Sequence, residues 1–122
     1  MRIYKEFRFD AAHFLPQAPE GHPNRRVHGH SFRAVIWLEG QVDSTSGLVM
    51  NFEVFKHEIE AFHVELDHHM LNEIPGLENP TLELITMWLW DRMKPRLPQL
   101  CRIELHRDSC NEGCIYDGPE DK

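Results

Sequence analysis

The sequence has few basic residues and no long apolar stretch. Lysine and arginine number 13 against 20 aspartates and glutamates, which gives a formal net charge of −7 with histidines neutral. Nucleic-acid-binding domains usually carry a basic stripe, so this balance argues against a nucleic-acid partner. No apolar run approaches the roughly 18 residues of a membrane span, and residues 1–6 lack the features of a signal peptide. The negative charge still allows a phosphorylated substrate, because a metal ion and a few arginines can reverse the local field.

Cysteine is also scarce. The chain has three, Cys101, Cys110 and Cys114, with no Cys-x-x-Cys spacing. An odd number of cysteines without paired spacing argues against a disulfide framework and favours reduced thiols in a cytoplasmic protein. A metal-binding or redox role for one of them is the alternative.

The length of 122 residues predicts one domain spanning residues 1–122. Apolar and polar residues alternate over 2–13 and 28–40, which predicts two strands, and again over 101–106 and 114–116. We also expect a short strand at 48–50, a loop at 15–27, a turn at 108–113 and a frayed tail at 117–122.

Two amphipathic helices are predicted between these strand pairs. The first begins at Asn51, an N-cap residue, and ends near residues 67–69; the second is capped by Asn79 or Thr81 and stops at Pro95. The order β-β-α-α-β-β predicts an α+β fold, an antiparallel sheet with both helices packed on one face.

Three histidines form the strongest candidate site. His28 and His30 stand two apart on a strand, so both rings point to one face, and His13 ends the preceding strand. Three imidazoles with an open fourth position are the pattern of a catalytic zinc site. Four other histidines are interpreted as solvated or hydrogen-bonded side chains: His22, His57, His63 and His106.

A second candidate is Asp67 followed by His68 at the end of the first helix. Alone, the pair could be a charge pair at a helix C-terminus. Beside a metal, it would be an acid/base histidine held in one tautomer by a carboxylate.

Taken together, these motifs resemble the 6-pyruvoyl-tetrahydropterin synthase family. The likeness is greatest to the bacterial branch that makes 6-carboxy-tetrahydropterin in the queuosine (7-deazaguanine) pathway. The segments that carry it cover nearly the whole chain: 9–13, 20–22, 27–32, 66–72, 74–81 and 110–116.

The resemblance implies a tunnelling fold whose sheets pair between subunits into a barrel. Two trimers then stack into a homohexamer with active sites at subunit boundaries. It also implies zinc on His13, His28 and His30 as the cofactor.

For the chemistry, the resemblance implies a lyase. The substrate would be 7,8-dihydroneopterin triphosphate, and triphosphate and acetaldehyde would leave as 6-carboxy-tetrahydropterin forms. Asp67 and His68 match the catalytic acid/base pair, which the likeness places at the site of a neighbouring subunit. Asp108 matches the glutamate that anchors the pterin ring, with a side chain one methylene shorter.

Two positions depart from the family pattern, the shorter Asp108 and Asn24, and a milder change is Asn51, where many relatives carry aspartate. The family's general-base cysteine lies four residues before the first histidine of His-x-His, where this chain has Asn24. Asparagine has no titratable proton near neutral pH, so it cannot be the base. Three alternatives follow: His68 or His22 replaces the cysteine, the chain acts on a different pterin, or it is a weak or inactive zinc- and pterin-binding paralogue.

Overall fold

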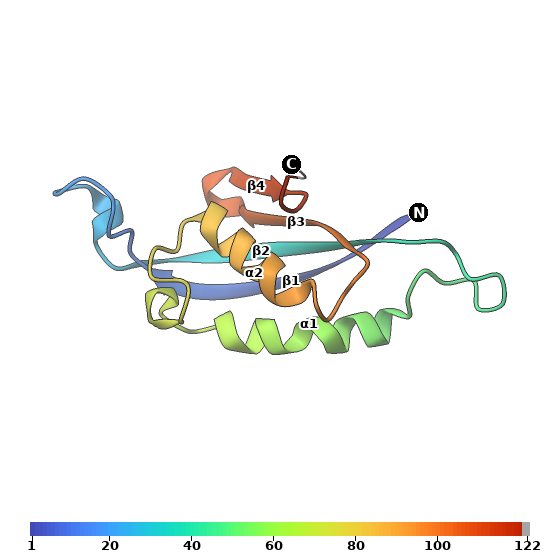
Figure 1. Ribbon diagram of the computed structural model, residues 1–122. Coiled ribbons are helices and arrows are strands. Elements are labelled where there is room, and N and C mark those ends of the chain that lie inside the picture. Colours follow the sequence, from blue (N-terminus) through green and yellow to red (C-terminus); the bar gives the residue numbers. More distant parts are fainter. Residues whose placement is uncertain (121–122) are drawn as a thin grey trace.

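The computed structural model describes residues 1–120, and these form one four-stranded sheet and two long helices (Figure 1). The strands are β1 (Arg2–His13), β2 (His28–Glu39), β3 (Leu100–Arg107) and β4 (Glu112–Tyr116). They lie in the order β1-β2-β3-β4, and every neighbouring pair is antiparallel. The predicted α+β arrangement, with a hairpin at each end of the chain, is confirmed.

The helices begin at side-chain caps. Helix α1 (Phe52–Leu66) is capped by Asn51, whose Oδ1 accepts from the backbone N–H of Glu53 at 2.7 Å. Helix α2 (Leu82–Met93) is capped by Thr81, whose Oγ1 accepts from the N–H of Leu84 at 3.1 Å. Of the two caps predicted for α2, the structure therefore selects Thr81. None of the helices within residues 1–120 has the length and apolarity to span a membrane.

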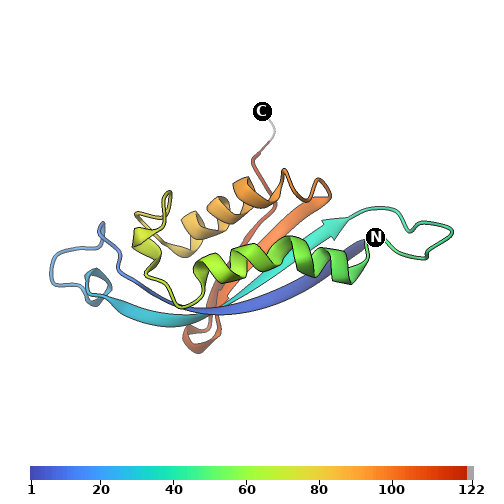
Figure 2. The ribbon, with the colours of Figure 1, turned by 90° about the horizontal axis from the view of Figure 1, so that it is seen from below.

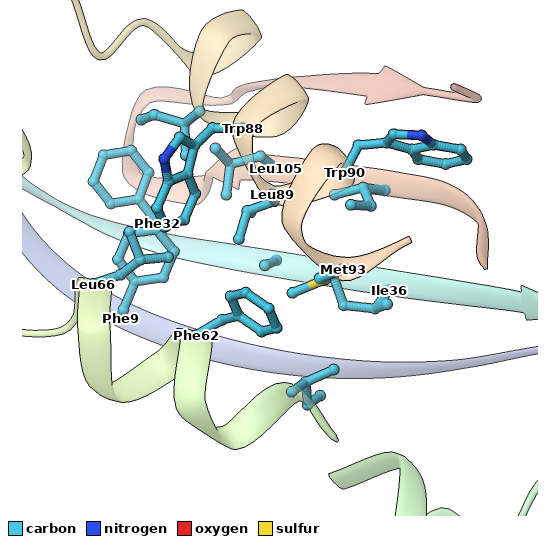
Figure 3. Close-up of a cluster of buried hydrophobic side chains, with 14 of the residues drawn as sticks. Phe9, Phe32, Ile36, Phe62, Leu66, Trp88, Leu89, Trp90, Met93 and Leu105 are labelled. Atoms are coloured by element: carbon cyan, nitrogen blue, oxygen red, sulfur yellow. The ribbon is translucent and has the colours of Figure 1, made fainter. Parts of the chain in front are cut away.

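Both helices cover the same face of the sheet (Figure 2). Phe9 of β1 and Phe32 of β2 stack with ring centroids 4.8 Å apart and meet Leu66 of α1 and Leu89 of α2 in the buried core (Figure 3). His13 continues the row of Phe9 along β1, so it leaves the strand on this helix-covered face.

The short strand predicted at 48–50 is wrong. This segment belongs to a loop that projects beyond the sheet between β2 and α1 (Figure 1). There Leu48 accepts a hydrogen bond from Asp43 across its own turn, and Gly47 adopts a φ of +75°. Three β-prone residues form no strand without a neighbouring strand to pair with.

The segment after α1 lies alongside the end of β1, parallel to it, and is hydrogen-bonded to it. Ala12 donates its N–H to the carbonyl of His69, and Asn72 exchanges two side-chain hydrogen bonds with the backbone of Phe14, at 3.0 and 2.8 Å. At the C-terminus, Asp117 accepts from Arg102 at 2.6 Å. Of the tail predicted to fray, residues 121–122 lie outside the described residues.

Candidate metal centre and adjoining cleft

The hairpin of β1 and β2 brings three histidines together. His13 pairs with His28 across the hairpin, and Ala11 pairs with His30, so the alternation of the strands sends all three rings to one side. The ring centroids lie 4.6 to 5.1 Å apart, and one nitrogen of each ring lies within 4.8 Å of the others. This cluster could hold a metal ion.

Hydrogen bonds set which nitrogen of each ring faces the cluster. Nδ1 of His13 lies 3.0 Å from the carbonyl oxygen of Pro80, and Nδ1 of His28 lies 2.7 Å from that of Arg26. A carbonyl can only accept, so each Nδ1 carries the proton and each Nε2 keeps a free lone pair.

Two of the inward nitrogens are buried without a partner. Nε2 of His13 and Nε2 of His30 make no hydrogen bond, although His13 is only 1% exposed. A buried polar atom left unpaired is costly, and a metal ion would satisfy both. The donor set of three imidazoles suits a divalent transition metal, so the residues fit such a group.

The cluster favours uncharged rings. Burial lowers the pKa of His13, the hydrogen bond to Pro80 opposes this, and the neighbouring His28 and His30 add to the lowering, which leaves the pKa at about 4. Burial also lowers the pKa of His30, with the charge of Arg107 acting in the same direction. Neutral imidazole is the form that binds metals.

A cleft of about 700 Å³ opens beside the cluster. It is lined by Asp10, Ala11, Ala12, Gly29, His30, Ser31, His68, His69, Met70 and Ser109. The cleft therefore joins a histidine of the cluster to His68 of the predicted acid/base pair. Within one chain, His30 and His68 thus line the same cleft.

Asp67 holds His68 in place. One carboxylate oxygen of Asp67 accepts the N–H of Asp10 at 2.8 Å, and the other lies 2.9 Å from Nδ1 of His68. The hydrogen bond from Asp10, followed by the contact with His68, lowers the pKa of Asp67 below its usual range. His68 itself has a φ of +58°, a strained conformation for a side chain of this size, and its ring is 79% exposed. A fixed, accessible imidazole of this kind can take part in proton transfer.

Asp108 lies on the turn between β3 and β4, outside the set that lines the cleft. Its carboxylate accepts from the guanidinium of Arg33 at 2.9 and 3.1 Å, and Arg8 lies 3.5 Å away. The hydrogen bond from Arg33 lowers the pKa of Asp108, so the group is ionised. A paired carboxylate retains lone pairs for a further donor.

The structure does not bring Asn24 to the cleft. Asn24 lies on an exposed 3-10 turn, Pro23–Arg25, where its N–H donates to Nδ1 of His22 at 3.1 Å. None of the lining residues comes from the 14–27 loop.

Two cleft residues were not foreseen from the sequence. Ser31 donates to a carboxylate oxygen of Asp10 at 2.5 Å, across the hairpin from one strand to the other. Their pairing depends on the strand register, which fixes His13 opposite His28 and hence Asp10 opposite Ser31. Knowledge of that register is the signal that would have found them.

Comparison with known proteins extends over nearly the whole chain. The model of the family described as 6-pyruvoyl tetrahydropterin synthase matches residues 2–119. The chain is 38% identical to a 6-carboxy-5,6,7,8-tetrahydropterin synthase of Synechocystis sp., over 96% of this chain and 93% of that one. It is 36% identical to a dihydroneopterin monophosphate aldolase of Pyrococcus furiosus, over 92% of this chain and 90% of that one.

The fold is shared with solved structures as well. A 6-pyruvoyl tetrahydropterin synthase of Caenorhabditis elegans superposes with a TM-score of 0.87, covering 98% of this chain and 96% of that chain. At 22% sequence identity this likeness speaks for the fold alone.

Proposed function

The chain belongs to the 6-pyruvoyl tetrahydropterin synthase family, a family of enzymes, and from this premise we propose that it is a zinc-dependent lyase acting on a pterin. The proposed reaction converts 7,8-dihydroneopterin triphosphate to 6-carboxy-tetrahydropterin with loss of acetaldehyde and triphosphate. The Synechocystis relative, named for making that product, supports this choice. Its place would be the 7-deazaguanine (queuosine) pathway.

His13, His28 and His30 would hold the zinc ion through Nε2, the nitrogen that the bonds to Pro80 and Arg26 leave free on two of the rings. Zinc bound there would supply a Lewis acid that polarises oxygen atoms of the substrate side chain. The lowered pKa of His13 keeps its ring in the neutral form at physiological pH, so no proton has to leave before the metal binds.

His68 would move the protons. Its Nδ1 faces the ionised Asp67, so Nδ1 carries a proton and Nε2 is left free as a base. Asp67 is itself fixed by the N–H of Asp10, and it would stabilise the imidazolium that forms when His68 takes a proton. The side chain of Asn24 offers no such group, so His68 takes the role of base in this proposal.

Asp108 would anchor the pterin ring by accepting from its ring N–H and amino groups. The two hydrogen bonds from the guanidinium of Arg33 keep this carboxylate ionised and fix its orientation. Asp108 adjoins Ser109, which does line the cleft. A bound pterin ring would therefore lie across the turn, and the side chain of the pterin would point toward the histidines.

One observation carries the proposal: a single cleft unites His30 of the histidine cluster with His68 of the Asp67–His68 pair. These residues are far apart in the sequence. A metal site alone would suit a binding module, but the adjoining carboxylate-held imidazole suits catalysis.

The test is product analysis by mass spectrometry of the zinc-loaded protein with 7,8-dihydroneopterin triphosphate. Formation of 6-carboxy-tetrahydropterin and acetaldehyde, at a rate lost in His68→Ala, is the expected result. Zinc and pterin bound without turnover would instead identify a non-catalytic binding paralogue and overturn the proposal. If Asn24→Cys then created activity, the missing thiol would be the cause.

A second candidate is an aldolase acting on a pterin monophosphate. The Pyrococcus relative, named for that activity, favours it. A retro-aldol cleavage would break the bond between the first two side-chain carbons, leaving a hydroxymethylpterin and a two-carbon aldehyde phosphate. Parallel incubations with the mono- and triphosphate distinguish the two candidates by their products. Replacing the exposed Arg25 and Arg26 with neutral residues tests whether they bind phosphate. If they do, KM should rise more for the triphosphate than for the monophosphate.

We further propose a homohexamer of two stacked trimers. β1 and β4 are the edge strands of the sheet, and paired edges would close a barrel between subunits. Native mass spectrometry tests this assembly, with a monomer as the contradicting result.

A further inference from the structure

The outer nitrogens of the three clustered imidazoles each have a neighbour, but the neighbours differ in kind. His13 and His28 use backbone carbonyls, those of Pro80 and Arg26. For His30, the neighbour of Nδ1 is the Sγ of Cys110, 3.9 Å away. Side chains that hold the outer nitrogen of a metal-binding histidine fix its tautomer and its orientation.

We infer that the thiol of Cys110 is a positioning residue that orients His30 for metal binding. This inference rests on the proposed metal centre. With the N–H of Nδ1 directed at sulfur, a polarizable and weak acceptor, Nε2 of His30 keeps its lone pair for the metal. That Nε2 is the buried atom without a hydrogen-bond partner.

The fold explains why the sulfur lies there. Cys110 ends the 3-10 turn Asp108–Cys110, which Asn111 closes in the left-handed region at a φ of +57°. Asp108 ties the start of this turn to Arg33, three residues beyond His30 on β2. The turn is thus fastened to the same strand as the metal ligand, and one short segment carries both the proposed pterin anchor and the thiol.

The other two cysteines provide a contrast. Cys114 is half-buried and lies 3.1 Å from the hydroxyl of Thr86, while Cys101 donates to the carbonyl of Trp37 at 3.5 Å. Cys110 is exposed, and besides His30 its sulfur lies 3.9 Å from the hydroxyl of Ser109. Its replacement therefore leaves the hydrophobic core intact.

The experiment measures zinc affinity by competition with a chromophoric chelator. Cys110→Val keeps the size of the side chain but removes the acceptor, and we expect zinc binding to weaken by about 10- to 100-fold. Cys110→Asn supplies a neutral amide oxygen and should restore most of the loss. Cys101→Val is the matched control and should bind zinc like the unaltered protein.

A second readout separates positioning from a general structural effect. In the zinc-loaded protein, the Nδ1 proton of His30 should exchange slowly with solvent by NMR, and should lose this protection in Cys110→Val but not in Cys110→Asn. The melting temperature of the metal-free Cys110→Val variant should stay unchanged, because the site is exposed.

Unaltered zinc affinity and an unaltered Nδ1 proton in Cys110→Val would overturn the inference. That outcome is distinct from failure of the proposed function, in which the unaltered protein would itself bind no zinc. It would also leave the lyase proposal standing if the unaltered protein bound zinc and turned over its substrate.

Discussion

A cluster of three histidines and a single histidine, His106, lie on the same sheet in opposite surroundings. The cluster of His13, His28 and His30 lies on the helix-covered face and presents buried nitrogens without partners. His106 lies on β3, and its Nε2 pairs with Glu104 at 2.9 Å, while the other oxygen of Glu104 accepts the indole N–H of Trp37 at 2.6 Å. In the cluster, two buried nitrogens lack partners that a ligand could supply, whereas Nε2 of His106 has its partner in the chain.

The difference teaches how to tell a functional histidine from a structural one. Both groups are half-buried or buried, and both are on regular strands, so position alone does not separate them. Accounting for each ring nitrogen does, because a folded chain rarely leaves a buried polar atom unpaired without a function. Each prediction below tests one side of this contrast, from the largest expected effect to the smallest.

Removing a cluster ligand should have the largest effect. His30→Ala takes away one of three nitrogens, and we expect zinc affinity to fall by more than the roughly 100-fold seen when an outer partner is lost, with turnover below detection. Zinc content after dialysis and competition with a chelator measure this. Retention of one tightly bound zinc per chain in His30→Ala would show that the metal is held elsewhere.

Removing His68, the proposed proton-transfer group, should spare the metal. His68→Ala should lower kcat by about 10²- to 10⁴-fold, the usual cost of losing a general acid or base, while zinc content stays the same. Asp67→Asn should give a smaller loss, because His68 keeps its place but loses the carboxylate that holds its tautomer. Steady-state kinetics beside zinc analysis of the same preparations checks both. A variant that lost zinc and activity together would assign His68 to the metal centre instead.

The sequence alone was sufficient to predict the strands and the histidine cluster on which this contrast depends. The alternation in 2–13 and 28–40 predicts two strands, and the His-x-His spacing with His13 predicts the cluster that the structure assembles. It failed at Leu48–Met50, where β propensity had no neighbouring strand to act on. It also missed the contact between Asp10 and Ser31 and the position of Cys110 beside His30. Both depend on strand register and on a turn fastened by Arg33, which are tertiary features with no local pattern.

The cluster should make the metal-free protein sensitive to mild acid. His13 has a pKa of about 4 in the folded chain against an ordinary value of 6.5, so the unfolded chain takes up a proton first as pH falls. The contribution of His13 to the free energy of unfolding should be complete above pH 6.5 and should decline between about pH 6.5 and 4. Below pH 4 this residue should cause no further loss. The lowering corresponds to about 3 kcal/mol.

Urea denaturation of the chelator-treated protein at several pH values measures this dependence. His13→Gln should flatten the profile, whereas His57→Gln, a change on the exposed face of α1, should leave it as it is. A metal-free protein whose free energy of unfolding stays constant from pH 7 to pH 4.5 would contradict the buried, neutral state of His13.

The smallest effect is expected at His106, the histidine whose Nε2 is already paired with Glu104. His106→Ala removes one hydrogen bond to Glu104, whose other oxygen still accepts from Trp37, so the free energy of unfolding should fall by only about 1 kcal/mol. Zinc affinity and kcat should not change, because His106 belongs neither to the cluster nor to the residues that line the cleft. Denaturation, chelator competition and kinetics on this one variant test all three expectations. If His106→Ala weakened zinc binding as His30→Ala is expected to, a histidine whose Nε2 is paired within the chain would be functional after all, and accounting for ring nitrogens would no longer separate His106 from the cluster.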